Sequence, residues 1–172
     1  MRGRYWLVFI LLVVAQILLG NFLNLGQFIT VCILPMLVLS LPVKYNDTVV
    51  MLIAFAAALT VDLLTHGILG LGVVAILPVA AGRRWIISAV FGSEVYSRGE
   101  DLSARKQGLL KMALAILIST AVYFAVYVWV DAAGTRSFGA NSLAWFLSTL
   151  VSSVAEVLLT GLLSERENGR WR

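Results

Sequence analysis

Three ionisable side chains lie within or at the end of long apolar stretches of the sequence: Asp62, His66 and Glu156. Placing such a group in the apolar part of a membrane costs roughly 3 kcal/mol on insertion scales, so it usually serves a function. Asp62 and His66 are four residues apart, so on a helix their side chains share a face and can form a carboxylate–imidazole hydrogen bond. A pair of this kind could relay protons or contribute to a metal site.

The rest of the chain offers little to complete such chemistry. A protein metal site needs three or four ligands, and this chain has a single histidine and a single cysteine, Cys32. Serine and threonine in the apolar stretches have no neighbouring histidine that could act as a base. The structural alternative is that His66 caps the carbonyl end of a helix and Asp62 accepts its hydrogen bond. We therefore predict no catalytic residue, metal or cofactor.

Glu156 lies about two helical turns before the end of the last apolar stretch. At the same predicted depth are Lys111, Arg83 and Arg84, which are its expected partners. A salt bridge between helices, or a protonated Glu156 that fixes packing, needs no chemistry. We expect Glu156 to have this structural role.

The composition identifies the environment of these side chains. Hydrophobic residues make up 60% of the 172 residues, charged residues 13%, and the mean hydropathy is +0.94, whereas a soluble domain is about 25% charged. Lipid must cover most of the surface. We predict an all-α integral membrane protein.

Apolar stretches predict six transmembrane helices in a single domain. Those at 27–41 and 67–82 are short, and each contains a proline, Pro35 and Pro78. The predicted helices cover residues 5–25, 27–41, 48–65, 67–82, 108–130 and 141–163. Residues 83–107 form the main hydrophilic loop, in which residues 85–91 are too short to span and are expected to lie along the membrane interface.

The positive charges assign an orientation. On a six-helix arrangement, all of the thirteen Lys and Arg residues except Arg136 fall on the side that holds both termini. By the positive-inside rule this side is cytoplasmic. The formal net charge of +4 does not indicate nucleic-acid binding, because the basic residues sit at the ends of apolar stretches and form no stripe with aromatic residues.

Several polar or small residues suit contacts between helices. Gly67, Gly70 and Gly72 do not have the spacing of a phosphate-binding loop, so close helix packing is the better interpretation. Polar residues in the first and last predicted helices are expected to hydrogen-bond across helices; they are Gln16, Asn21, Ser148, Ser152 and Ser153.

This layout resembles the family of the rod shape-determining protein MreD. The resemblance runs from about residue 11 to 85, and beyond that only helix number and spacing agree; His66 departs from the pattern. It rests on Gln16, Leu34-Pro35, Leu41-Pro42, Val61-Asp62-Leu63-Leu64, the Gly67-Ile68-Leu69-Gly70-Leu71 corner and the Arg83-Arg84 pair. It implies a non-catalytic scaffold in the bacterial inner membrane that regulates peptidoglycan synthesis and cell shape, with MreC-like, RodA-like, class B penicillin-binding and MreB proteins as partners.

Two other functions remain open. MreD-like proteins are similar in fold to the substrate-binding subunits of energy-coupling-factor vitamin transporters, and proline-interrupted helices are typical of transporter sites. A small-molecule binding subunit would need a polar cavity around Asp62, which is expected near the outer end of its helix. A membrane enzyme would need a third polar group converging on Asp62 and His66.

Overall fold

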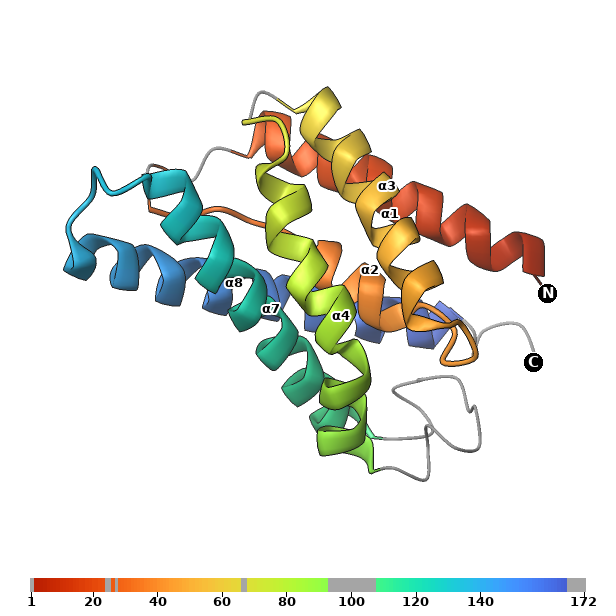
Figure 1. Cartoon of the computed structure of the whole chain (residues 1–172). Helices are drawn as coiled ribbons and strands as arrows, with labels where there is room; N and C mark the ends of the chain where they lie inside the picture. Colours follow the sequence, from red (N-terminus) through yellow and green to blue (C-terminus); the bar gives the residue numbers. More distant parts are fainter. Residues whose placement is uncertain (1, 24–25, 27, 66–67, 93–107, 167–172) are drawn as a thin grey trace.

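A computed structural model describes residues 2–23, 26, 28–65, 68–92 and 108–166 of the chain. Within these ranges the regular structure is entirely helical, which confirms the predicted all-α class. The helices are α1 (Arg2–Phe22), α2 (Leu34–Ser40), α3 (Asp47–Leu64), α4 (Leu71–Phe91), α7 (Leu109–Ala132) and α8 (Phe138–Arg166), shown in Figure 1.

Four of these helices are long and apolar enough to cross a membrane: α3, α4, α7 and the Phe138–Leu162 part of α8. The apolar part of α1, Trp6–Phe22, is shorter, and α2 has only seven residues. Seven helical residues extend about 10 Å, against a hydrocarbon thickness of about 30 Å. The multi-pass membrane architecture is therefore confirmed, whereas the prediction of six spanning helices is wrong at α2.

The predicted helix at 27–41 is helical only from Leu34 to Ser40. Pro35 lies in the first turn of α2, where a missing N–H costs nothing; farther inside a helix its ring would clash with the preceding turn. The preceding residues include Ile29, Thr30 and Val31, whose β-branched side chains favour extended backbone. The broken segment, residues 28–41, thus combines an extended segment, residues 28–33, with a short helix.

The fourth helix is longer than predicted. α4 continues through Pro78 and the arginine pair to Phe91, so residues 83–91 are helix rather than loop or a separate interfacial segment. The extension is stabilised by burial, because Ile87 and Phe91 pack in a cluster with Met112 and Ile116 of α7. The charged pair Arg83-Arg84 predicts the end of the helix, but hydrophobic contacts beyond the pair keep α4 helical to Phe91.

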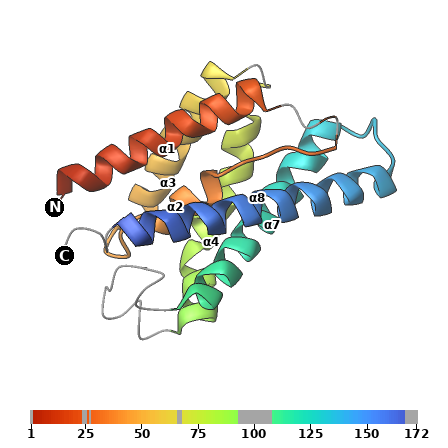
Figure 2. The same ribbon diagram turned by 180° about the vertical axis from the view of Figure 1, so that it is seen from behind.

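Helices that follow one another in sequence pack together: α3 against α4, α4 against α7, and α7 against α8. The short α2 contacts α1, α3, α4 and α7, and its residues from Leu34 to Leu39 are buried. Figure 2 shows α1 and α8 on the outside of the bundle, with the extended segment running beside α8. The broken segment is therefore the central element around which the longer helices assemble.

Candidate functional site

Polar side chains of α8 form a ladder of hydrogen bonds along the extended segment. The Ser148 hydroxyl accepts the N–H of Thr30 at 3.0 Å and donates to the carbonyl of Phe28 at 3.3 Å. One turn along, the Ser152 hydroxyl accepts the N–H of Cys32 at 3.0 Å and donates to the carbonyl of Thr30 at 3.3 Å. Each serine thus replaces the partner that a neighbouring β-strand would provide.

The ladder is possible because four residues of an α-helix and two residues of an extended chain advance by nearly the same distance. Four residues of an α-helix advance about 6 Å, and two residues of extended chain advance about 6.6 Å. Ser148 and Ser152 are four residues apart, and the amides that they accept, those of Thr30 and Cys32, are two residues apart. A serine at every fourth position can therefore satisfy alternate residues of a strand.

The other edge of the extended segment is held by α1. The side-chain amide of Gln16 accepts the N–H of Ile33 at 2.7 Å and donates to the carbonyl of Val31 at 3.4 Å. An unpaired backbone group in lipid costs several kcal/mol, so non-helical backbone persists there only when protein groups satisfy it. Gln16, Ser148 and Ser152 explain how an extended chain is accommodated inside this bundle.

Two buried polar side chains, one an acceptor and one a donor of hydrogen bonds, bind the two ends of α2. At its first turn the fully buried Glu156 accepts the N–H of Met36 at 3.2 Å and the hydroxyl of Thr120 at 2.6 Å. At its last turn the buried guanidinium of Arg83 donates to the carbonyls of Leu39 and Leu41. A carboxyl oxygen thus accepts at the N-terminal end of α2, where helices leave N–H groups without partners, and a guanidinium donates at the C-terminal end, where they leave carbonyls without partners.

This arrangement differs from the partners predicted for Glu156. Arg83 contacts the opposite end of α2, while Lys111 and Arg84 are exposed on α7 and α4. The side chain that does bind Glu156 is Thr120, which no motif in the sequence marks. The spacing of Ser148, Ser152 and Glu156, each four residues apart, was the available signal that one polar stripe of α8 has a common partner.

Asp62 forms a second polar contact, between α3 and α4. Its Oδ2 accepts the N–H of Gly70 at 3.0 Å and that of Val73 at 3.3 Å, at the start of α4. Gly70 has φ of +87°, a conformation that glycine adopts without strain. Gly72 lies so close to Asp62 that a Cβ would collide with the carboxylate. The half-buried Asp62 therefore fixes the α3–α4 corner as a helix cap.

His66 and Gly67 lie outside the described residues, so the predicted Asp62–His66 hydrogen bond stays a prediction. The prolines do not share a site: Pro35 lies in the buried first turn of α2, whereas Pro78 is exposed on α4. The eight predicted residues that the structure describes thus divide between the α3–α4 corner, the ends of α2 and exposed positions.

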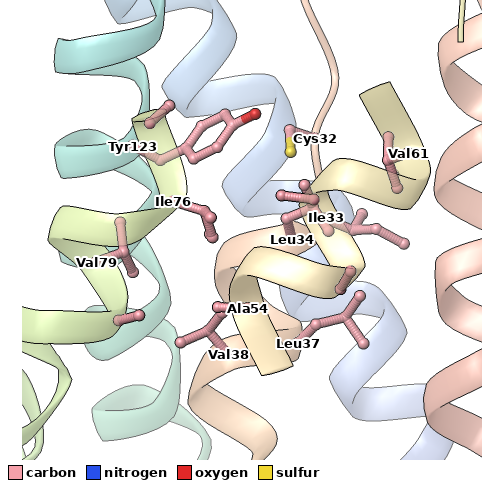
Figure 3. Packing of buried hydrophobic residues seen from close by; sticks show 14 of the residues in the cluster. Cys32, Ile33, Leu34, Leu37, Val38, Ala54, Val61, Ile76, Val79 and Tyr123 are labelled. Carbon is pink, nitrogen blue, oxygen red and sulfur yellow. The ribbon is translucent and has the colours of Figure 1, made fainter. Parts of the chain in front are cut away.

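Cys32 is buried at the inner end of the extended segment and faces the hydroxyl of the buried Tyr123 of α7 (Figure 3). Figure 3 shows this hydroxyl pointing toward the sulfur atom, above the apolar cluster that includes Ile33, Leu37 and Ile76. Within the described residues, no group of three or more His, Cys, Asp or Glu side chains could hold a metal ion.

No protein-family model, curated protein or solved structure matches this chain.

Proposed function

We propose that this protein is a non-catalytic scaffold of the bacterial cell-wall elongation complex, as its resemblance to the MreD family implies. In this role it would lie in the cytoplasmic membrane beside MreC-like, RodA-like and class B penicillin-binding proteins and MreB, and regulate peptidoglycan synthesis and cell shape. The proposal rests on this resemblance and on the polar side chains inside the bundle, which bind backbone groups of the protein itself.

The hydrogen bonds to the broken segment are the observation that carries the proposal. Gln16, Ser148 and Ser152 bind the backbone of the extended segment, and Glu156 and Arg83 bind the ends of α2. Side chains engaged in this way stabilise the fold and are not aimed at a substrate. Such use favours a structural role over a catalytic one.

The broken segment also supports the proposed orientation, with both termini in the cytoplasm. Six extended residues reach about 20 Å and seven helical residues about 10 Å, together close to the hydrocarbon thickness of about 30 Å. Residues 28–40 would then complete a crossing that α2 alone cannot make. With α1 and the four long helices this would make six crossings, for which the positive-inside rule favours a cytoplasmic side that holds Lys44, Arg84 and Lys111.

The test is purification of the tagged full-length protein from its native membranes in a mild detergent, followed by identification of the bound proteins. We expect an MreC-like protein with a single membrane helix and a RodA-like protein, each confirmed by reciprocal purification from the tagged partner. A tagged membrane protein of similar size and abundance, with no role in wall synthesis, is the control. Absence of both partners would contradict the scaffold proposal.

A small-molecule binding subunit of a transporter is the second candidate. It is favoured by the broken segment, because transporters commonly form their sites at discontinuous helices. Recovery of an ATPase pair with its coupling membrane subunit, or of a bound small molecule, in the same purification would support this candidate and overturn the scaffold.

A further inference from the structure

The backbone of the extended segment has two edges, because the N–H and C=O groups of successive residues in an extended chain point to opposite sides. On the edge that faces α8, the carbonyl of Phe28 and the N–H of Thr30 bind Ser148. The carbonyl of Thr30 and the N–H of Cys32 bind Ser152. Side chains of α8 therefore satisfy this edge along the segment.

The edge that faces α1 is satisfied only at the end next to α2. Gln16 binds the carbonyl of Val31 and the N–H of Ile33. The next groups along this edge are the N–H of Val31 and the N–H and C=O of Ile29. None of them has a hydrogen-bond partner among the described residues, although backbone groups inside a protein almost always have one. We call these groups of Ile29 and Val31 the open edge.

The sequence of α1 explains why its side chains do not reach the open edge. α1 and the extended segment run side by side in opposite directions (Figure 2), so later residues of α1 face earlier residues of the segment. The residue four positions after Gln16 is Gly20, where α8 repeats a serine at the same interval. Gly20 has no side chain that could bind the backbone, and a Cβ there would collide with Thr65. α1 thus supplies one polar side chain where α8 supplies two.

The surroundings of the open edge are accessible. Ile29 and Val31 are partly exposed, and Thr30 between them is exposed. Phe28 is 42% exposed, and Phe22 at the end of α1 is 83% exposed. An accessible strand edge with unpaired N–H and C=O groups is a template for pairing with another chain.

Gln16 shows which chemistry this edge binds. Its side-chain amide uses one donor and one acceptor, which are the groups that a peptide bond presents. The N–H of Val31 and the C=O of Ile29 are the same pair, two residues earlier along the same edge. A peptide group could therefore bind there as the Gln16 amide binds the carbonyl of Val31 and the N–H of Ile33.

We propose that the open edge is a docking site for an extended stretch of a partner protein. Peptide groups of the partner pair with the N–H of Val31 and the backbone groups of Ile29, in the manner of strand addition. The exposed rings of Phe22 and Phe28 are available for apolar contacts with its side chains. The site does not depend on which of the two candidate functions holds.

The first experiment uses N-methylacetamide, a single peptide group, as the probe. It is titrated into the isotope-labelled full-length protein in lipid nanodiscs, and backbone amide signals are followed by nuclear magnetic resonance. We expect saturable shifts at Ile29 and Val31, and none at Thr30 and Cys32, whose N–H groups are already bound by serines. N,N-dimethylacetamide is the matched control. It lacks the N–H that the carbonyl of Ile29 would accept, so it should bind about tenfold more weakly, the factor that one neutral hydrogen bond contributes.

Two outcomes of the titration would overturn the proposal. One is the absence of a saturable shift at Ile29 and Val31, which would leave water as the only partner of the open edge. The other is a shift of equal size at Thr30 and Cys32, which would show that the probe acts without regard to the edge.

A proline substitution tests the same N–H by a second route. Val31→Pro removes an N–H that no described residue binds, and proline is tolerated at a strand edge whose N–H is unpaired. We expect this variant to fold and to lose binding of N-methylacetamide. Thr30→Pro removes the N–H that Ser148 accepts and should lower the melting temperature. A folded Val31→Pro variant that binds the probe as tightly as the wild type would contradict the docking site.

Amide hydrogen exchange tests the accessibility of the open edge without a probe or a substitution. We expect the amides of Ile29 and Val31 to exchange at least about tenfold faster than those of Thr30 and Cys32, because hydrogen bonding protects the latter. Exchange that alternates along the chain in this way identifies one open and one bound edge. Equal protection of the four amides would show that the edge facing α1 is closed to a partner and would overturn the proposal.

Discussion

Glu156 of α8 and Arg83 of α4 bind opposite ends of the same seven-residue helix. Both residues find backbone partners in or next to α2, one at each end. The carboxylate accepts an N–H of the first turn, and the guanidinium donates to carbonyls of the last turn. A helix too short to be stable alone is thereby held in the centre of the bundle.

Glu156→Ala is expected to destabilise the protein by roughly 3 kcal/mol, because it leaves the Met36 N–H and the Thr120 hydroxyl unpaired and creates a cavity. Glu156→Gln keeps a carbonyl oxygen of similar size and should cost much less. Denaturant unfolding in detergent, followed by circular dichroism, measures both. A Glu156→Gln variant as unstable as Glu156→Ala would show that the negative charge, rather than the acceptor, is essential.

The adjacent arginines should respond differently to the same change. Arg83→Ala removes the donor for the carbonyls of Leu39 and Leu41 in a buried site, with an expected loss of roughly 2 to 3 kcal/mol. Arg84 is exposed, where ion pairs are worth about 0 to 1 kcal/mol, so Arg84→Ala is the matched control. Thermal unfolding of the two variants side by side makes the comparison. Equal losses would contradict the assignment of Arg83 to the end of α2.

The sequence predicted the membrane environment, the helical class and the approximate positions of α1, α3, α7 and α8, because long apolar stretches have few alternatives in lipid. It failed at the broken segment. The apolar stretch at 27–41 predicts one helix by its hydropathy, although β-branched residues at 29–31 and 33 and Pro35 favour an extended chain followed by a new helix start.

The contacts of the polar residues were harder to predict than their positions. Ser148, Ser152 and Gln16 are predicted to hydrogen-bond across helices, but their partners are backbone groups of an extended segment, where the sequence predicts a helix. The apolar surroundings of Glu156 predict either a salt bridge with a basic residue at the same depth or a protonated side chain that fixes packing. Its partners in the structure are the Thr120 hydroxyl and the Met36 amide, and neither is a basic side chain.

Gly72 offers a steric test of the α3–α4 corner. A Cβ at this position would collide with the Asp62 carboxylate, so Gly72→Ala should destabilise the protein by about 1 to 3 kcal/mol. Gly82, in the same helix, has open space around its Cβ position. Gly82→Ala should therefore stabilise the protein by up to about 1 kcal/mol, since glycine is a poorer helix former than alanine. The measurement is the sign of the shift in melting temperature for each variant. If Gly72→Ala stabilised the protein, the close contact between Gly72 and Asp62 would be contradicted.

Asp62 should act as a helix cap, and its contribution to stability should depend on a side-chain oxygen that accepts hydrogen bonds. Asp62→Ala leaves the N–H groups of Gly70 and Val73 without this partner, and the expected loss is about 1 to 2 kcal/mol, typical of a removed cap. Asp62→Asn keeps one side-chain oxygen and should retain more than half of that stability. Because alanine at position 62 also removes the group that a Cβ at Gly72 would strike, Asp62→Ala and Gly72→Ala together should cost less than the sum of the single changes. Strict additivity of the two losses would show that the carboxylate and Gly72 are not in contact.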